Sequence, residues 1–223
     1  MRASVCALPT FTSIVPGVNE PGSPAQITFA EIYARAGNDL GAIPWAALAP
    51  QPALVEWLNG QPPGAGRPAL IVACGVGDDA EEISRRGYTV TAFDLVPAAI
   101  GHCRERFPES AVDYRVADLF QLPAQWRQAF DLVVEIRTLQ SLPLPLRPEA
   151  VAIIAGTVRP GGQVFVHGLG RDDDGAPGTR PWPVSHRELS AFRTTGLREQ
   201  ELSDDPGGSS SGRRTLTAVY ARP

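Results

Sequence analysis

The chain has 223 residues, a length typical of one domain. All 20 of its basic residues are arginine, because the sequence contains no lysine. That absence excludes enzymes that form a Schiff base through a lysine amine, and it excludes P-loop nucleotidases and protein kinases, whose phosphate sites need a lysine. The net charge of −4 provides no attraction for a phosphate backbone, so we expect no nucleic-acid partner.

No run of apolar residues is long enough for a membrane span, so we expect no membrane partner. The amino-terminal segment is interrupted by Pro9 and Pro16 and makes a poor signal peptide. The whole chain has three cysteines, Cys6, Cys74 and Cys103, and their spacing does not match that of metal ligands. These features predict a cytoplasmic protein with reduced thiols and no metal site.

The chain divides at residue 68, where a segment rich in proline and glycine gives way to apolar, β-branched runs. Residues 1–67 contain two short predicted helices, 27–36 and 52–58, and we expect the first 44 residues to fold over the site as a lid. Residues 68–223 alternate apolar, β-branched runs with amphipathic segments and form the core of one compact domain.

Five strands are expected in the core, and their alternation with helices predicts a parallel sheet. The first is a continuous apolar run typical of a strand buried on both faces. The five strands span 69–74, 88–94, 112–118, 130–136 and 163–169, and the helices between them span 78–87, 97–107 and 145–158. A hard turn over 159–162 precedes the fifth strand.

The remainder of the chain predicts a helix over 185–196, capped by Ser185 with Glu188, and then two strands joined by a loop rich in Gly and Ser. The fold class is therefore α/β: a doubly wound, Rossmann-like sheet of seven strands, mostly parallel with an antiparallel C-terminal hairpin.

In a doubly wound sheet, ligands bind beyond the carboxyl ends of the strands. After the first strand, the turn Ala73-Cys74-Gly75-Val76-Gly77 would let the backbone approach a ligand at a helix N-terminus. The next three strands end in Asp94, Asp118 and Glu135. A carboxylate accepts hydrogen bonds from ribose hydroxyls, and so many acids favour a neutral or cationic ligand over a polyphosphate.

The segment 69–100 resembles the cofactor-binding half of class I S-adenosylmethionine (SAM) dependent methyltransferases. The segments VADLF, FDLVVEI and VRPGGQVFVHG are similar to that family's later motifs, in order and spacing, over about residues 68–169. The upstream segment IPWAALAPQPALVEWL looks like that of the thiopurine, thiol and tellurite-resistance methyltransferases. The chain departs from the usual pattern at Ala73, where the family has glycine, and at Asp78.

The resemblance implies SAM as cofactor and assigns roles to residues of the glycine turn and the strand ends. Backbone of the turn would approach the methionine and ribose, one acid would hold the ribose hydroxyls, a second acid the adenine amino group, and apolar side chains would contact the adenine. The implied cofactor-binding residues are Trp45 as a cover, Ala73, Gly75, Gly77, Asp94, Leu95, Asp118, Leu119, Glu135 and Ile136.

Methyl transfer needs no enzyme nucleophile, and with no lysine available the candidate bases are Glu135 and His167, with Asp118 less favoured. Arg137 and Gln140 follow the fourth strand and could orient an acceptor carboxylate. Arg171 and Trp182 belong to a loop expected over the same edge.

The sequence predicts a small-molecule acceptor, a thiol, amine or hydroxyl, and a monomer or homodimer. Three alternatives stay open. The chain could use SAM without transferring a methyl group to an acceptor, it could bind SAM without catalysis, or it could be an NAD-dependent dehydrogenase, since Ala80 is tolerated at the third glycine of the dinucleotide motif.

Overall fold

The computed structural model describes residues 28–207 and 212–223. The expected lid therefore falls partly outside the described residues, as does the centre of the loop between the last two strands. Among the described helices, none combines the length and the apolar character needed to cross a bilayer.

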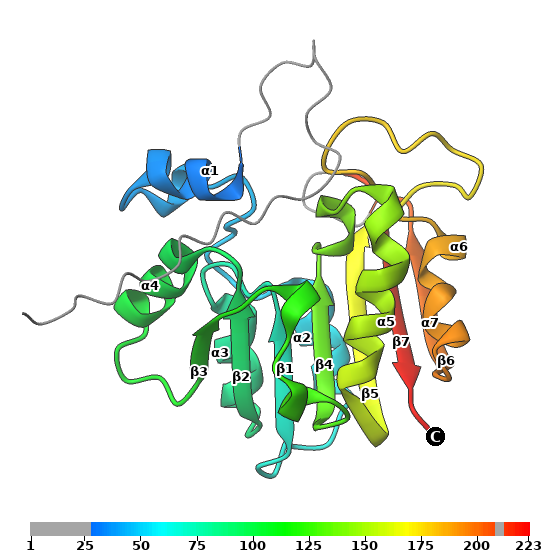
Figure 1. Ribbon diagram of the computed structural model, residues 1–223, viewed down its shortest axis with the longest axis horizontal. Coiled ribbons are helices and arrows are strands. Elements are labelled where there is room, and N and C mark those ends of the chain that lie inside the picture. Colours follow the sequence, from blue (N-terminus) through cyan, green and yellow to red (C-terminus); the bar gives the residue numbers. More distant parts are fainter. Residues whose placement is uncertain (1–27, 208–211) are drawn as a thin grey trace, which may run out of the picture.

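The core is a seven-stranded sheet with the order β3-β2-β1-β4-β5-β7-β6 (Figure 1). Neighbouring strands among the first five pair in parallel, whereas β7 pairs antiparallel with both β5 and β6. This arrangement confirms the predicted fold class. The strands are β1 (Pro68–Val72), β2 (Thr89–Asp94), β3 (Asp113–Val116), β4 (Phe130–Ile136), β5 (Val158–Leu169), β6 (Arg198–Asp205) and β7 (Thr215–Ala221).

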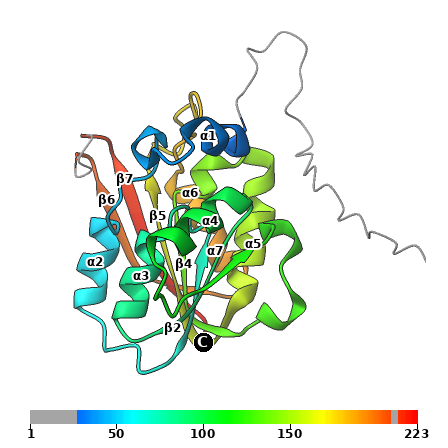
Figure 2. The same ribbon diagram turned by 90° about the vertical axis from the view of Figure 1, so that its left-hand side faces the viewer.

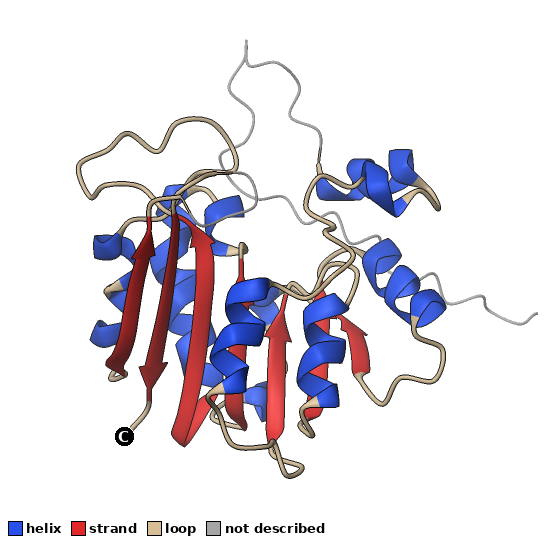
Figure 3. Cartoon of the chain, turned by 180° about the vertical axis from the view of Figure 1, so that it is seen from behind, coloured by secondary structure: helices blue, strands red, loops and turns tan. Residues whose placement is uncertain are grey.

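Helices cover both faces of the sheet (Figures 2 and 3). One face carries α2 (Pro52–Asn59), α3 (Asp78–Arg85) and α4 (Pro97–Arg106), and the other carries α5 (Arg147–Thr157), α6 (His186–Leu189) and α7 (Ala191–Thr194). Each face buries its own apolar cluster, because successive side chains of a strand point to opposite faces.

Helix α1 (Phe29–Ala36) lies above the carboxyl-end edge of the sheet, beside α4 (Figure 1). Thr28 starts it, because its hydroxyl accepts the Glu31 amide while the Glu31 carboxylate accepts the Thr28 amide. Tyr33 and Ala36 are buried in a small third cluster with Val76 of the glycine turn. The upstream helix is thus attached to the part of the core where a ligand is expected.

Two expectations about element boundaries were wrong. Strand β5 begins at Val158, not at residue 163, because Val158 pairs with Phe130 and the expected turn 159–162 forms an irregularity within the strand. The expected single helix over 185–196 is two short helices that meet at Ser190, whose hydroxyl donates to the Arg187 carbonyl and competes with helix continuation.

Smaller differences have local causes. Strand β1 stops at Val72 because Ala73 has a φ of +49°, outside the range of a strand. Helix α5 begins at Arg147, later than expected, because the prolines before it fit the short 3-10 turn Leu144–Leu146.

Gly77 is the residue on which the start of α3 depends. It has a φ of +96° and forms the N-cap of the helix. A Cβ at this position would lie 2.7 Å from the Tyr114 hydroxyl and 3.1 Å from the Cys103 sulfur. Both neighbours are buried, and the Tyr114 hydroxyl also donates to Glu81 at 2.7 Å, so neither can move away freely.

We predict that Gly77→Ala lowers the free energy of unfolding by about 2–4 kcal/mol, from the left-handed backbone and the overpacking together. Gly101→Ala is the matched control, since Gly101 lies within α4 and an added Cβ would meet nothing within 4 Å. There, the better helix propensity of alanine should raise stability by up to about 1 kcal/mol. Urea denaturation of both variants measures the difference, and equal effects would contradict the assignment.

Candidate cofactor-binding site

The carboxyl ends of the parallel strands meet at one edge of the sheet, and the strand order reverses between β1 and β4. Such a switch point opens a crevice, because the connections from the two strands leave in opposite directions. The residues that follow β1, β2 and β4 therefore come together here, although they lie far apart in the sequence.

Asp94 ends β2 and binds the glycine turn directly. One carboxylate oxygen accepts the Gly75 amide at 3.0 Å, and the other accepts the Val96 amide at 2.9 Å. Burial raises the pKa of Asp94 to about 6, against the lowering effect of these amide hydrogen bonds. Each carboxylate oxygen keeps a second lone pair that can accept a ligand hydroxyl.

Gly75 has room for a Cβ without a clash, and two aromatic side chains lie at contact distance above it. An added Cβ at Gly75 would meet no atom closer than 3.8 Å, and its nearest neighbours are the Tyr33 hydroxyl and the Trp45 ring. The Trp45 indole N–H donates to the Tyr33 hydroxyl at 3.3 Å, and the two rings are in edge contact. Trp45 thus lies over the turn, and its role as a cover for a cofactor stays a prediction. Ala73 adopts left-handed backbone, which explains why glycine is common at that position in the similar family.

Apolar and acidic groups at the ends of β2 and β3 differ in their surroundings. The Leu95 side chain is 45% exposed beside the buried Asp94, so a flat apolar group could cover it. The Asp118 carboxylate accepts the Phe120 amide at 2.9 Å, while Leu119 packs into the core. Leu95 is therefore exposed, Asp118 is half-buried, and Leu119 is buried in the core.

Glu135 lies on β4, next to β1, and is buried. Its Oε1 accepts the amides of Thr138 at 2.6 Å and Leu139 at 2.9 Å, so the side chain shapes the turn that follows the strand. Burial raises the pKa of Glu135 to about 7. Ile136, the next residue, is half-buried and packs against the apolar cluster on the sheet face covered by α2, α3 and α4.

His167 lies on β5, opposite Ile136 in the parallel pairing. Its Nδ1 is 2.8 Å from the Thr217 hydroxyl of β7. Burial and the nearby Arg137 guanidinium lower the pKa of His167 to about 4, so the ring is neutral at physiological pH.

Three of the four expected acceptor-binding residues hold the framework together. The Gln140 side-chain oxygen accepts the Leu169 amide at 2.6 Å, and its carbonyl accepts the Trp182 amide at 2.7 Å. Arg171 binds Glu188 at 2.7 Å and the Pro183 carbonyl at 3.0 Å. Trp182 takes part only through its backbone, and the Arg137 side chain has no hydrogen bond to any described residue.

Sequence reasoning missed two residues of this edge. Asp79, in the first turn of α3, accepts the Gln51 amide at 2.7 Å and so attaches the start of α2 to the glycine turn. Burial raises its pKa to about 6. Arg180 extends over the Phe29 ring, with its guanidinium carbon 4.3 Å from the ring centroid. Neither residue belongs to a motif that the sequence makes recognisable.

These residues fit a nucleoside attached to a cationic group. The Gly75 backbone follows β1, and the Asp94 carboxylate and the exposed Leu95 lie at the end of the neighbouring strand β2. Within the described ranges, no group of His, Cys, Asp and Glu side chains could hold a metal ion.

Comparisons with known proteins agree with this geometry. Residues 69–162 match the sequence family described as a methyltransferase domain. A ubiquinone biosynthesis O-methyltransferase of Aromatoleum aromaticum is 35% identical over 123 residues, covering 54% of this chain and 52% of that protein. The chain thus spans about half the length of the curated relatives it matches.

Solved structures share the fold at low identity. A TehB-like SAM-dependent methyltransferase from Corynebacterium glutamicum superposes with a TM-score of 0.62 at 20% identity, over 87% of this chain and 98% of that one. The N-methyltransferase NodS from Bradyrhizobium japonicum, in complex with S-adenosylhomocysteine, gives 0.62 at 23% identity, over 77% and 84%. Residues 69–162 are therefore similar to a methyltransferase domain, and the chain has the Rossmann-like fold seen in solved SAM-dependent methyltransferases.

Proposed function

We propose that this protein transfers a methyl group from SAM to a small-molecule acceptor. The observation that carries the proposal is the contact between Asp94 and the Gly75 amide, within the segment that matches a methyltransferase domain. That contact places a carboxylate beside the backbone of the glycine turn. Trp45 and Tyr33 cover the same backbone, which supports an enclosed site over a bare binding surface.

In the proposed complex, Asp94 accepts the ribose hydroxyls and Leu95 contacts the adenine, with Asp118 accepting from the adenine amino group. The backbone of Ala73, Gly75 and Gly77 approaches the methionine part. When bound, SAM supplies an activated methyl group on a positively charged sulfur. The protein's task is to position the acceptor in line with that methyl group and to exclude water, for which Trp45 is placed.

The two candidate bases differ in their suitability. A general base works best with a pKa near the operating pH, which Glu135 meets at about 7 and His167 does not at about 4. We therefore propose Glu135 as the residue that takes the acceptor proton, and we assign His167 a role in holding β5 to β7 through Thr217.

Oxygen is the acceptor atom that the relatives favour, since the similar curated proteins are O-methyltransferases. A hydroxyl needs a base more than a thiol does, because its pKa is higher. The raised pKa of Glu135 is consistent with that need. The narrower resemblance to the thiopurine and tellurite-resistance group stays a prediction.

The alternative uses of SAM differ in their products. Incubation of the protein with SAM alone should leave the cofactor intact, whereas addition of an acceptor should release S-adenosylhomocysteine. Formation of methylthioadenosine without an acceptor would indicate an intramolecular reaction of SAM and would contradict methyl transfer. Binding of SAM without turnover of any acceptor would instead favour a non-catalytic module, and binding of NAD in place of SAM would favour a dehydrogenase.

We predict that Asp94→Ala weakens SAM binding by about 1–3 kcal/mol, the cost of losing a hydrogen bond to a charged group. Calorimetric titration measures the change. Asp113→Ala is the control, because Asp113 lies exposed at the other end of the neighbouring strand and pairs with Arg115. Unchanged affinity in Asp94→Ala would place the ribose elsewhere.

SAM affinity should also depend on pH through Asp94. Because its pKa in the free protein is raised to about 6, the carboxyl group takes up a proton below that pH and loses acceptor capacity for the ribose hydroxyls. We predict a dissociation constant that rises towards about tenfold per pH unit below pH 6 and stays level above pH 7. Asp94→Asn should abolish this dependence, and a persisting slope in that variant would assign the titration to another group.

We predict that Glu135→Gln lowers kcat by about a hundredfold or more, the usual contribution of a general base. The glutamine oxygen can still accept the Thr138 and Leu139 amides, so the turn and SAM binding should be preserved. The pH dependence of kcat near pH 7 should disappear in the variant. An unchanged kcat would show that the acceptor loses its proton without help from Glu135.

A further inference from the structure

Two arginines at the carboxyl-end edge are half-buried, and within the described ranges no carboxylate lies within ion-pair distance of either. They are Arg137, directly after β4, and Arg180, in the loop between β5 and α6. Other arginines of the same loop region are paired: Arg147 and Arg171 both bind Glu188, at 2.6 and 2.7 Å. Burying a cation without an anion costs free energy, so this arrangement calls for an explanation.

Arg180 is held in place by an aromatic contact. Its guanidinium carbon lies 4.3 Å from the Phe29 ring centroid, and the Phe29 ring is in edge contact with Trp45 at 5.3 Å. Trp45 in turn covers the turn at Gly75. The pKa of Arg180 is lowered, and burial is the cause. The aromatic ring orients the guanidinium but leaves its N–H donors free for an anion.

Arg137 is fixed by its backbone. Its φ is +62°, and its amide donates to the His167 carbonyl at 2.8 Å, so the residue turns between the ends of β4 and β5. The positive charge of its guanidinium lowers the pKa of His167 and partly offsets the rise that burial causes in the pKa of Asp79. The charge therefore lies near the glycine turn and β5. With Trp182 bonded to Gln140, the loop of Arg180 is attached to the same turn after β4.

We propose that the acceptor is a small molecule bearing an oxyanion, a carboxylate or a phosphate group, which Arg180 binds together with Arg137. This inference rests on the proposed methyl transfer. A guanidinium presents two parallel N–H donors that match both kinds of oxyanion. The same negative charge would be attracted by the sulfonium of the cofactor, so the acceptor and the donor would meet with complementary charge.

The test uses the full chain loaded with S-adenosylhomocysteine and three probes of matched shape: 3-hydroxybenzoate, 3-hydroxyphenyl phosphate and the uncharged 3-hydroxybenzamide. Ligand-observed NMR titration measures binding. At least one charged probe should bind with a dissociation constant of about 10 mM or less, as expected for a fragment of this size. The amide should bind at least about tenfold more weakly. The comparison between the two charged probes shows which oxyanion fits.

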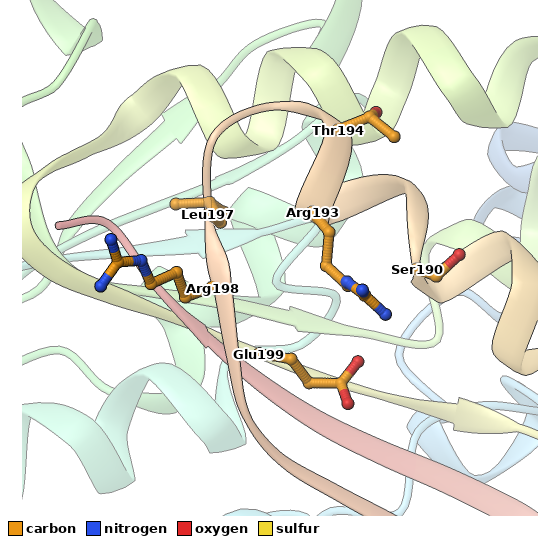
Figure 4. A pocket seen from close by; sticks show the side chains of 6 residues that line it. All are labelled: Ser190, Arg193, Thr194, Leu197, Arg198 and Glu199. Carbon is orange, nitrogen blue, oxygen red and sulfur yellow. The ribbon is translucent and has the colours of Figure 1, made fainter.

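Arg180→Gln should weaken the charged probe by about 10- to 100-fold and leave the amide unchanged, the cost of losing a charged hydrogen-bonding partner. Arg137→Gln should weaken it in the same direction. Arg193→Gln is the matched control. Arg193 is exposed and lines a surface hollow of about 830 Å³ beside α7 and the start of β6 (Figure 4). Arg198 of that hollow pairs with Ala221, whereas Thr215 pairs with Leu169 at the site edge, so the hollow lies at the opposite end of β7.

The outcomes separate the two proposals. If S-adenosylhomocysteine does not bind, the proposed function fails and the anionic acceptor fails with it. If it binds, the proposal is overturned when neither charged probe binds at about 10 mM, when the amide binds as tightly as the charged probes, or when Arg180→Gln and Arg193→Gln have equal effects. Unfolding temperatures of the variants, measured alongside, show whether loss of the Phe29 contact has loosened α1.

Discussion

Buried carboxylates that capture backbone amides hold the carboxyl-end edge of this protein together. Asp94 binds the amides of Gly75 and Val96, Asp79 binds that of Gln51, and Glu135 binds those of Thr138 and Leu139. Each bond crosses from a strand or helix to a neighbouring loop. The chain has no lysine, and these acids use amides in place of a cation as their main partners. An amide neutralises less charge than a cation does, so burial prevails and raises the pKa of all three.

The raised pKa values of these carboxylates decide which ligand charge the site favours. A carboxylate with a pKa near 6 or 7 is poised to exchange a proton at physiological pH, and a cation bound beside it would lower that pKa again. The edge therefore favours a positively charged ligand, which would restore the ionised state of the acids while binding. If these carboxylates bind the cofactor as proposed, cofactor binding and loop stability would be coupled, because the same groups would serve both.

The sequence was sufficient for the fold because local patterns specify it. Apolar runs ending in Gly75, Asp94 and Glu135 predicted the parallel strands and the edge where their ends meet. Side-chain partners were not predictable in the same way. Gln140 looked available for an acceptor, but it binds Leu169, which is 29 residues away, and Arg171 binds Glu188 across a loop. Such pairings depend on how loops cross the edge, and no periodicity encodes them. Asp79 was missed for the same reason, since its partner Gln51 lies in the upstream segment.

Acidic and basic side chains occupy different positions along the carboxyl-end edge of the sheet. Asp79 lies in the first turn of α3, and Asp94 and Glu135 lie near the ends of β2 and β4. Arg137 lies between the ends of β4 and β5 and Arg180 in the loop after β5, and neither forms an ion pair with a described residue. A cationic donor bound over the acids would thus face the arginines across the transferred methyl group. Transfer neutralises the sulfur, so the donor product would lose its attraction to both the acids and an anionic acceptor at the moment the reaction ends. The arrangement of charges would then favour binding before transfer and release after it.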